Sequence, residues 1–512
     1  MIQKIIVSFI SFSLLLLSCT KLDEKLRGNL TSEQVGGGGA GANVDALLKG
    51  VYNNMRGPFQ ADNGIYTLFV VTTDELVVPT RGPDWDDNGV FTSLHGLTLT
   101  GEHLVNGGLF NNLNGIVFAA TEILRFSPTP QQAAEARMLR AMAQFLLLDG
   151  WDQLPYREPG ESALEAPKVR KGLEALDYII TELNAILPDL PAGIKTKANK
   201  DAAKVLLMKC YLNKGAIANR AAPTFDAADM QQVITLADEV IASGYTFSAN
   251  YFDNFAPANT TIGKENIWVH ENIGGVESGG IRSRYHSGIH YNQPPGGWNG
   301  FSTTAEFYNK FEPTDVRRGV AYPANDAEHP NPGNRVNVGF LAGQQYDLKT
   351  DAPLQAGAIP LAYTTEVQPI ETGDNLEVTG VRVYKYAVDW IHAGTDLNDN
   401  DYVYFRLADV MLMKAEALLR TDGAGAALPI VNAIRADRGV PALGAVTLDD
   451  LLDERGRELY TEGWRRQDLI RFGKFLDARP TKPQASDPKY LLFPIPNQQI
   501  AANPNLVQNP GY

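Results

Sequence analysis

Two tryptophans of this 512-residue chain stand on loop sequences with no apolar pattern to bury them. Trp85 lies in Thr80-Arg-Gly-Pro-Asp-Trp-Asp-Asp-Asn-Gly89, and Trp298 lies in Asn292-Gln-Pro-Pro-Gly-Gly-Trp-Asn-Gly-Phe301. A flat ring beside carboxylate, amide or guanidinium groups suits a sugar, because the ring stacks on C–H faces while the polar groups bond hydroxyls. The two loops therefore predict a ligand surface, and the alternative is that each ring tucks under its own loop.

Polar and aromatic neighbours extend this candidate site. Arg81, Asp84 and Asn299 flank the two tryptophans and are the nearest hydrogen-bonding candidates. Asp74 is a weaker hydrogen-bonding candidate, and Tyr285 and Tyr291 would extend the same surface. The other four tryptophans stand in apolar or helical contexts that predict burial: Trp151, Trp268, Trp390 and Trp464.

Patterns for catalysis or metal binding are weak. His286 and His290 are four residues apart but belong to no HExxH arrangement. Asp396, Asn398 and Asn400 have the spacing of a Ca²⁺ loop without its glycine at the sixth or glutamate at the twelfth position. No nucleophile elbow or phosphate-binding loop is present. We expect no catalytic residue, metal or cofactor, although a carboxylate pair for glycoside hydrolysis stays open.

The first 19 residues predict export and lipid anchoring. Lys4 precedes an apolar run that ends at Leu16-Leu17-Ser18-Cys19, which looks like a bacterial lipobox. Residues 1–18 would be the signal peptide, and acylated Cys19 would hold the protein on a membrane without a spanning helix. A plain secretory signal is the alternative. Residues 19–41, with four consecutive glycines, suit a flexible tether.

Composition narrows the partners. A net charge of −14 argues against nucleic acid and against anionic lipid, because both favour clustered Lys and Arg. Besides Cys19 the chain has Cys210, which stands in an apolar helical pattern and is expected in the core.

Apolar periodicity predicts a mainly α fold with helix pairs around a loop-rich insertion. Helical spacing covers 43–56, 102–126, 131–150, 173–187, 199–214, 228–243, 406–420, 426–438, 448–461 and 464–475. Strands are expected at 267–270 and 381–386. We expect one domain, 42–512: a helical scaffold (42–245 and 403–480), a loop-rich ligand-face insertion (246–402) and a C-terminal tail (481–512).

Several blocks resemble the SusD/RagB family of nutrient-uptake lipoproteins. Residues 454–473 carry every fixed position of its E-R-x-x-E-L-x-x-E-G-x-R-x-x-D-L-x-R-x-G pattern. The helix Arg406-Leu-Ala-Asp-Val-Met-Leu-Met-Lys-Ala-Glu-Ala-Leu418 and the tail Asn503-Pro-Asn-Leu-Val-Gln-Asn-Pro-Gly-Tyr512 are similar as well. The resemblance also includes Phe493-Pro-Ile-Pro496 and the region from Ala134 to Tyr156.

The resemblance implies a mostly helical body with tetratricopeptide-like pairs, no catalysis, and a lipid anchor in the outer membrane, facing the exterior. It implies a SusC-like TonB-dependent barrel as partner, to which the protein delivers oligosaccharides or, in the RagB branch, peptides. Trp85 and Trp298 fall where family members place parts of their ligand platform. A lipid-anchored glycoside hydrolase and a scaffold that binds only protein are the alternatives from other classes.

The charges of the 454–473 block predict a structural role. Glu454, Glu458 and Glu462 recur every fourth residue, and Arg455 and Arg457 can pair with Glu458 or Glu462 nearby. The pattern indicates an ion-pair network that locks one helix pair, with a ligand role as the alternative.

Overall fold

Helices dominate the regular structure and fall close to the predicted ranges. The computed structural model describes residues 43–421 and 423–512, and Val44–Tyr512 form one compact unit. The predicted signal peptide (1–18), the lipidation site Cys19 and the tether (19–41) lie outside the described residues. The mainly α fold class is confirmed, whereas the tetratricopeptide-like geometry of the pairs stays a prediction.

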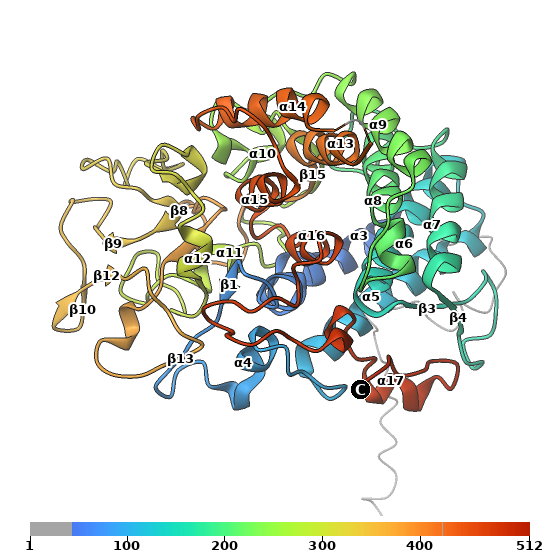
Figure 1. The fold of residues 1–512 in the computed structure, drawn as a ribbon, viewed down its shortest axis with the longest axis horizontal. Helices are drawn as coiled ribbons and strands as arrows, with labels where there is room; N and C mark the ends of the chain where they lie inside the picture. Colours follow the sequence, from blue (N-terminus) through green and yellow to red (C-terminus); the bar gives the residue numbers. More distant parts are fainter. Residues whose placement is uncertain (1–42, 422) are drawn as a thin grey trace, which may run out of the picture. The chain divides into compact units, whose positions relative to one another are not determined.

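Six long helices come first in the described part of the chain, and from α5 to α9 each packs on the next (Figure 1). They are α3 (Val44–Gln60), α5 (Leu104–Ile123), α6 (Pro130–Trp151), α7 (Gly172–Ile186), α8 (Lys200–Ala218) and α9 (Ala227–Ile241). Local signals set their ends. Thr129 and Gln132 form a capping box at the start of α6, with Pro130 at its first position. Asp152, with a φ of 60°, ends it.

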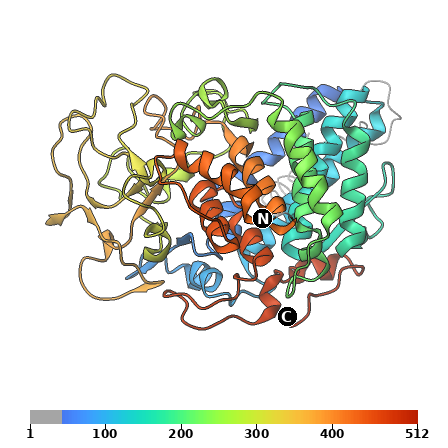
Figure 2. The same cartoon turned by 45° about the horizontal axis from the view of Figure 1, so that its top comes forward.

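Four further helices return at the predicted place after the insertion. They are α13 (Leu407–Thr421), α14 (Ala424–Asp437), α15 (Leu448–Leu459) and α16 (Arg465–Arg471). Helix α13 packs against α8, α9, α14 and α15, so the first and last parts of the chain share one core (Figure 2). Cys210 is buried in that core, as predicted, and burial raises the pKa of its thiol. Shorter helices are α4 (Val90–His95), α10 (Asn259–Ile262), α11 (Ser283–His286), α12 (Ala305–Tyr308) and α17 (Asn497–Ala502).

Seven small sheets hold the irregular part of the unit. The two predicted strands are present, as β5 (Asn266–His270) and β14 (Arg382–Tyr384). The pairs of the sheets are β1 (Leu76–Val77) with β6 (Ser302–Thr303), β2 (Thr80–Arg81) with β13 (Ile370–Glu371), β3 (Gln153–Tyr156) with β4 (Lys168–Lys171), β5 with β15 (Tyr402–Arg406), β9 (Gly343–Gln344) with β12 (Ala362–Tyr363), and β10 (Gln355–Ala356) with β11 (Ile359–Pro360). The last sheet orders β14, β8 (Val338–Leu341) and β7 (Gly319–Val320).

Strands β1 and β2 attach an early segment of the chain to the insertion. Leu76 pairs with Thr303, and Thr80 pairs with Ile370 in parallel. The π-helical turn η2 (Asp62–Val70) leads into this segment. The loop that carries Trp85 is therefore placed against the residues that follow Trp298, more than 200 positions later.

The charged block is buried, and it joins several elements instead of one helix pair. Glu458 bonds Arg317 (2.8 Å), Arg406 (2.6 Å) and Arg438 (2.9 Å), and all four side chains are fully buried. Glu462 bonds Arg406 and Lys385. The structural interpretation is confirmed.

The predicted partners of two arginines in that block are wrong. Arg455 pairs with Asp409 and Asp468, at 3.2 and 2.9 Å, and Arg457 pairs with Glu454 at 2.6 Å. Helix α15 also ends at Leu459, two residues before the end of the predicted range 448–461. Helical spacing favours local pairs on a surface, but burial gives the long-range partners priority because an unpaired buried charge is costly.

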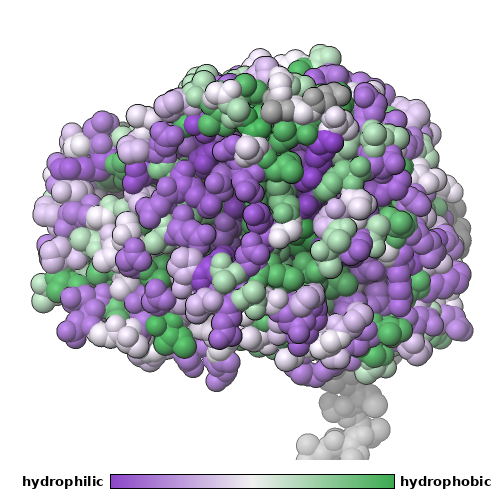
Figure 3. All heavy atoms as spheres, viewed as in Figure 1, coloured by the Kyte–Doolittle hydropathy of each residue, from purple (hydrophilic) through white to green (hydrophobic). Residues whose placement is uncertain are grey.

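Within the described ranges no helix is long and apolar enough to cross a bilayer. The view in Figure 3 shows hydrophilic residues over most of this face of the unit, with hydrophobic residues in smaller groups between them.

Candidate ligand-binding site

The loops that carry Trp85 and Trp298 meet in the structure. The indole Nε1 of Trp85 donates a hydrogen bond of 2.9 Å to the carbonyl oxygen of Trp298. Trp85 has a φ of 59°, within the left-handed region, in a short turn where the main chains of Arg81 and Asp84 bond each other. The two tryptophans are thus in direct contact, although they stand on loops far apart in the sequence.

The two rings differ in exposure. Trp298 is 48% exposed, whereas Trp85 is half-buried. The ring of Trp85 meets Phe91 and Phe301 edge-on, with centroid distances of 5.3 and 5.8 Å, and it lies over Gly300. A Cβ on Gly300 would stand 2.4 Å from the Trp85 ring, so only glycine admits this packing. Trp85 is therefore partly a core residue, and Trp298 supplies the open surface.

Tyr291 is a second exposed ring on the loop that carries Trp298, and each of the two rings packs against a histidine. Tyr291 is 47% exposed and lies 3.9 Å from the ring of His290, centroid to centroid. Trp298 meets the ring of His286 edge-on at 4.8 Å. Burial lowers the pKa of both histidines, so neutral imidazoles support the rings at neutral pH. We call Trp85, Tyr291 and Trp298 the aromatic face.

Buried arginines hold the loops of the aromatic face in place. Arg81 donates all five N–H groups: to the carbonyls of Asn299, Gly300 and Thr379 and to the hydroxyls of Ser302 and Thr379. Burial, reinforced by the neighbouring Arg382, lowers the pKa of Arg81. A guanidinium with every donor engaged has none left for a ligand, so Arg81 positions the loop instead of contacting a sugar.

Asn299 is also a supporting residue. Its side chain is buried, donates to the carbonyl of Glu377 at 3.0 Å and accepts from Arg382 at 2.6 Å. Its φ of 54° lies in the left-handed region that asparagine tolerates better than most residues. The sequence placed Arg81 and Asn299 correctly beside the two tryptophans, but the tertiary structure turns both side chains inward.

Two further predicted residues lie in the interior. The carboxylate of Asp74 forms a two-pronged ion pair with Arg465, at 2.8 and 2.7 Å. Burial alone would raise the pKa of Asp74, but Arg465 outweighs it and lowers the pKa to about 2. Tyr285 is 1% exposed in a second hydrophobic cluster. Neither side chain is available to a ligand on the aromatic face.

Acidic groups border the aromatic face. Asp84 is exposed on the Trp85 loop, as predicted, and its charge acts on the Tyr291 hydroxyl. Glu377, which the sequence analysis did not single out, accepts a hydrogen bond from Nε2 of His290 at 3.2 Å. Burial, with Glu377 beside it, raises the pKa of Tyr291, so the phenol stays protonated. These carboxylates can accept hydrogen bonds from sugar hydroxyls next to the exposed rings.

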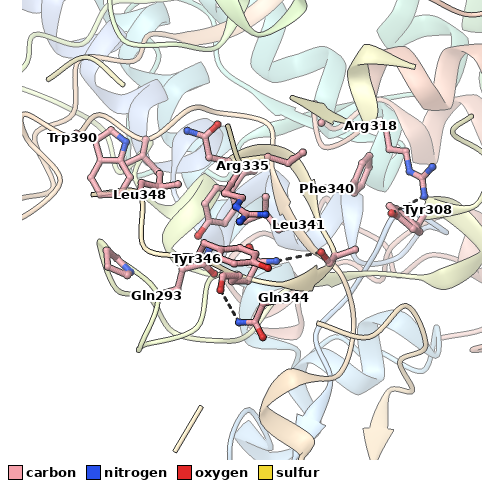
Figure 4. A pocket seen from close by; sticks show the side chains of 18 of the residues that line it. Gln293, Tyr308, Arg318, Arg335, Phe340, Leu341, Gln344, Tyr346, Leu348 and Trp390 are labelled. Atoms are coloured by element: carbon pink, nitrogen blue, oxygen red, sulfur yellow. Dashed lines mark hydrogen bonds between the residues drawn. The ribbon is translucent and has the colours of Figure 1, made fainter. Parts of the chain in front are cut away.

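A cavity of about 400 Å³ opens beside the aromatic face, and we call it the insertion pocket (Figure 4). The loop that carries Tyr291 continues into its wall through Gln293 and Pro294. Other lining side chains come from β7–β9 and their connections: Arg318, Arg335, Phe340, Gln344, Gln345 and Tyr346. Trp390 lines it as well and is half-buried, so its predicted core position is only partly correct.

Sequence reasoning missed the insertion pocket because its residues come from separate short segments. One signal was available: Tyr346 follows Gly343-Gln-Gln, an apolar-poor setting like that of the two loop tryptophans. Arg318 and Arg335 had no such signal, since an arginine in a loop is ordinarily solvated.

Metal and catalytic patterns do not assemble. Across residues 43–421 and 423–512, no group of three or more His, Cys, Asp or Glu side chains is placed to hold a metal ion. His286 and His290 contact different aromatic rings. In the Ca²⁺-like segment, Asp396 pairs with Arg282, while the Asn400 amide donates to main-chain carbonyls of the core.

Known proteins with similar sequences belong to one family. A model of the SusD family matches residues 264–512. The starch-binding protein SusD of Bacteroides thetaiotaomicron is 28% identical over 431 residues, which cover 77% of this chain and 75% of that protein. The chain is thus similar to the SusD family in sequence over residues 264–512 and to SusD over most of its length.

Solved SusD-like structures share the fold over nearly their whole length. A SusD superfamily protein from Parabacteroides distasonis matches with a TM-score of 0.71 and 21% identity, covering 94% of this chain and 100% of that one. Surface glycan-binding protein A from Bacteroides thetaiotaomicron, solved with laminarihexaose, matches with a TM-score of 0.67 and 18% identity, covering 91% and 98%. Two of these proteins, SusD and surface glycan-binding protein A, are named as binding proteins.

Proposed function

We propose that this SusD-like protein captures oligosaccharides on its aromatic face and performs no catalysis. The observation that carries the proposal is the pair of exposed rings, Trp298 and Tyr291. Each ring packs against a histidine, and Arg81 fixes the loop of Trp298 by a hydrogen bond to the adjacent main chain. Rigid rings lose little conformational entropy when they stack on a ligand, so their exposed area is available for binding. Asp84 and Glu377 at the border supply acceptors for hydroxyl groups.

The relatives support the choice of sugar as ligand. One is named for starch, and one solved structure contains a laminari-oligosaccharide. Capture of peptides, as in the RagB branch, is the alternative within the family, and a glycoside hydrolase is the alternative outside it.

The proposal extends to the cellular setting. The protein would be acylated at Cys19, lie on the outer surface of the outer membrane, and hand its ligand to a SusC-like TonB-dependent barrel. The lipobox-like Leu16-Leu17-Ser18-Cys19 and the resemblance to SusD proteins support this placement. Copurification of such a barrel from native membranes in mild detergent tests the partnership, and recovery of the protein alone contradicts it.

Binding of a polysaccharide panel to the compact unit, expressed without residues 1–41, tests the ligand class. Wild-type protein should bind at least one oligosaccharide of the panel, measured by isothermal titration, and release no reducing ends. Trp298→Ala should weaken that binding about tenfold, the size expected for one lost stacking partner. Because the Trp298 side chain is exposed, the melting temperature of the variant should equal that of the wild type. Hydrolysis of the glycan, or binding of peptides alone, would contradict the proposal.

A further inference from the structure

The insertion pocket has an unusual charge for a sugar site. Arg318 and Arg335 are its charged lining side chains, and neither aspartate nor glutamate is among the described residues that line it. The chain as a whole carries a net charge of −14, so this concentration of positive charge is local.

Arg335 uses two of its three guanidinium nitrogens in an ion pair. Its Nε and Nη2 bond the carboxylate of Asp351 at 2.7 and 3.1 Å, and its guanidinium lies 3.6 Å above the ring of Tyr346. Among the described residues, Nη1 has no hydrogen-bond partner. The ion pair and the ring hold the guanidinium in place while Nη1 keeps its two donors.

Arg318 has no carboxylate partner in the described part of the chain. Its Nη2 donates to the hydroxyl of Tyr308 at 2.8 Å, and its guanidinium lies 4.6 Å from the centroid of that ring. The adjacent Arg317, in contrast, is fully buried in the ion-pair network of Glu454 and Glu458. Arg318 therefore brings an uncompensated positive charge and free donors to the pocket wall.

The amides of the pocket add few free donors. The side-chain nitrogen of Gln344 bonds the carbonyls of Gln345 and Leu354, and that of Gln345 bonds Gly343. The carboxamide of Gln293 is engaged at both ends, by Gln345 and Tyr363. With these amide nitrogens engaged, the guanidinium groups of Arg318 and Arg335 are the main donors left in the wall, and they are charged.

Two rings shape the pocket for a pyranose. Tyr346 has Arg335 on one face, and Trp390 is stacked on His329 with a centroid distance of 3.8 Å and an interplanar angle of 22°. Trp390, Tyr346 and Gln293 are among the side chains that line the pocket (Figure 4). Supported rings beside free guanidinium donors suit a sugar residue that carries an anion.

The aromatic face has the opposite charge. Asp84 and Glu377 border it, and the loop that carries Tyr291 continues into the pocket wall at Gln293. A negatively charged stretch of glycan would be repelled by these carboxylates and attracted by Arg318 and Arg335.

We propose that the insertion pocket binds an anionic substituent of the captured glycan, a carboxylate or a sulfate ester, while a neutral stretch lies on Trp298 and Tyr291. The inference rests on the proposed function and narrows its ligand class to glycans that carry such groups. The free donors of Arg318 and Nη1 of Arg335 would hold the anion.

Matched polysaccharide pairs test the inference on the unit without residues 1–41. The pairs are glucuronoxylan with its carboxyl-reduced form and κ-carrageenan with its desulfated form; amylopectin and laminarin are the neutral probes. We expect the preferred ligand to be an anionic member and its neutral counterpart to bind about tenfold more weakly. Carboxyl reduction and desulfation distinguish the two sources of the charge. Affinity for the anionic ligand should also fall as salt is raised.

Substitutions assign the effect to the pocket. Arg318→Gln should reduce the preference for the anionic member of the pair to less than about twofold, and Arg318→Lys should retain part of it. Arg157→Gln removes the same charge from a half-buried position after β3, outside the lining of the insertion pocket. It is the matched control and should leave the preference unchanged. Melting temperatures show whether each variant is folded.

The possible outcomes distinguish failure of the inference from failure of the proposed function. Tight binding of a neutral glycan, with no preference for the anionic members, overturns the inference and leaves the proposed function intact. A preference that survives Arg318→Gln and Arg335→Gln in folded protein overturns the assignment to this pocket. Absence of binding to every saccharide overturns the proposed function and the inference together.

Discussion

Trp85 and Trp298 are joined by the hydrogen bond from the indole of the first to the carbonyl of the second, 213 positions away. The contact makes the half-buried ring a support for the loop that presents the exposed one. Removal of Trp85 and removal of Trp298 should therefore have different consequences, although both residues stand on similar loop sequences.

Trp85→Ala should lower both stability and glycan affinity. The variant loses ring contacts with Phe91 and Phe301, and because the ring is half-buried we expect a loss of about 2 kcal/mol. Trp85→Phe keeps most of the packing but not the hydrogen bond, so it should cost about 1 kcal/mol. Urea unfolding and titration of the bound glycan measure the two effects. An unchanged melting curve for Trp85→Ala would show that the ring does not support the loop.

Gly300→Ala should displace the Trp85 ring. The new Cβ would lie 2.4 Å from ring atoms of Trp85, and we expect about 1–3 kcal/mol of destabilisation with weaker glycan binding. Gly108→Ala is the matched control, since its Cβ would meet no atom within 4 Å on helix α5. That control should gain about 0.5–1 kcal/mol, because alanine favours a helix interior. Thermal unfolding compares the pair, and similar shifts in both variants would contradict the packing argument.

Glu458→Gln should severely destabilise the unit. The carboxylate pairs with three buried arginines, Arg317, Arg406 and Arg438, and its neutral replacement leaves their charges undercompensated. Breaking a buried ion pair costs about 3–5 kcal/mol. Glu239→Gln removes a surface pair with Lys204 and should cost less than about 1 kcal/mol. Denaturant unfolding of both variants gives the comparison, and equal losses would refute a structural role for the buried network.

Glu75 should make stability fall as pH rises from 5 to 8. Burial raises the pKa of its carboxyl from 4.5 to about 8, against the opposing effects of the Thr461 amide and Arg465. In this window the folded protein keeps a proton that the unfolded chain releases, so the free energy of unfolding decreases with pH. Glu75→Gln removes the ionisable group and should flatten this part of the profile by a few kcal/mol.

Asp401 contributes to the same window, because burial raises the pKa of its carboxyl to about 8. In Glu75→Gln the free energy of unfolding should therefore still decrease with pH, but less steeply than in the wild type. Asp401→Asn should remove a further part of this pH dependence. Glu165→Gln, at an exposed position, is the control. Chemical unfolding at pH 5, 6, 7 and 8 measures the profiles. A Glu75→Gln profile parallel to that of the wild type would contradict the assignment.

Cys19→Ala should release the protein from membranes. The substitution removes the thiol that would be acylated, and no helix of residues 43–421 and 423–512 can span a bilayer. Fractionation of native host cells that lack the partner barrel measures the effect, with Cys210→Ala as the control. Retention of Cys19→Ala protein in the membrane fraction would contradict the lipid anchor.

Sequence alone determined the helices, the resemblance to SusD proteins and most of the buried tryptophans. Helix α6 shows why. Its capping box, Pro130 and apolar stripe are local signals, so they can be recognised in the sequence without knowledge of the tertiary structure. Trp151, Trp268 and Trp464 are buried as predicted, because apolar neighbours in sequence mark an element that faces the core.

Only the tertiary structure decided the partners of charged and loop residues. Arg455 pairs with Asp409, 46 positions away, and Arg81 donates to carbonyls near position 300. Trp85 is half-buried because Gly300 and Phe301 come under its ring. Local spacing cannot show which distant groups share a buried volume. An unpaired charge or donor in a buried volume is costly, so only arginines with partners there are buried. Arg318, which has no carboxylate partner among the described residues, instead keeps its guanidinium at the pocket wall.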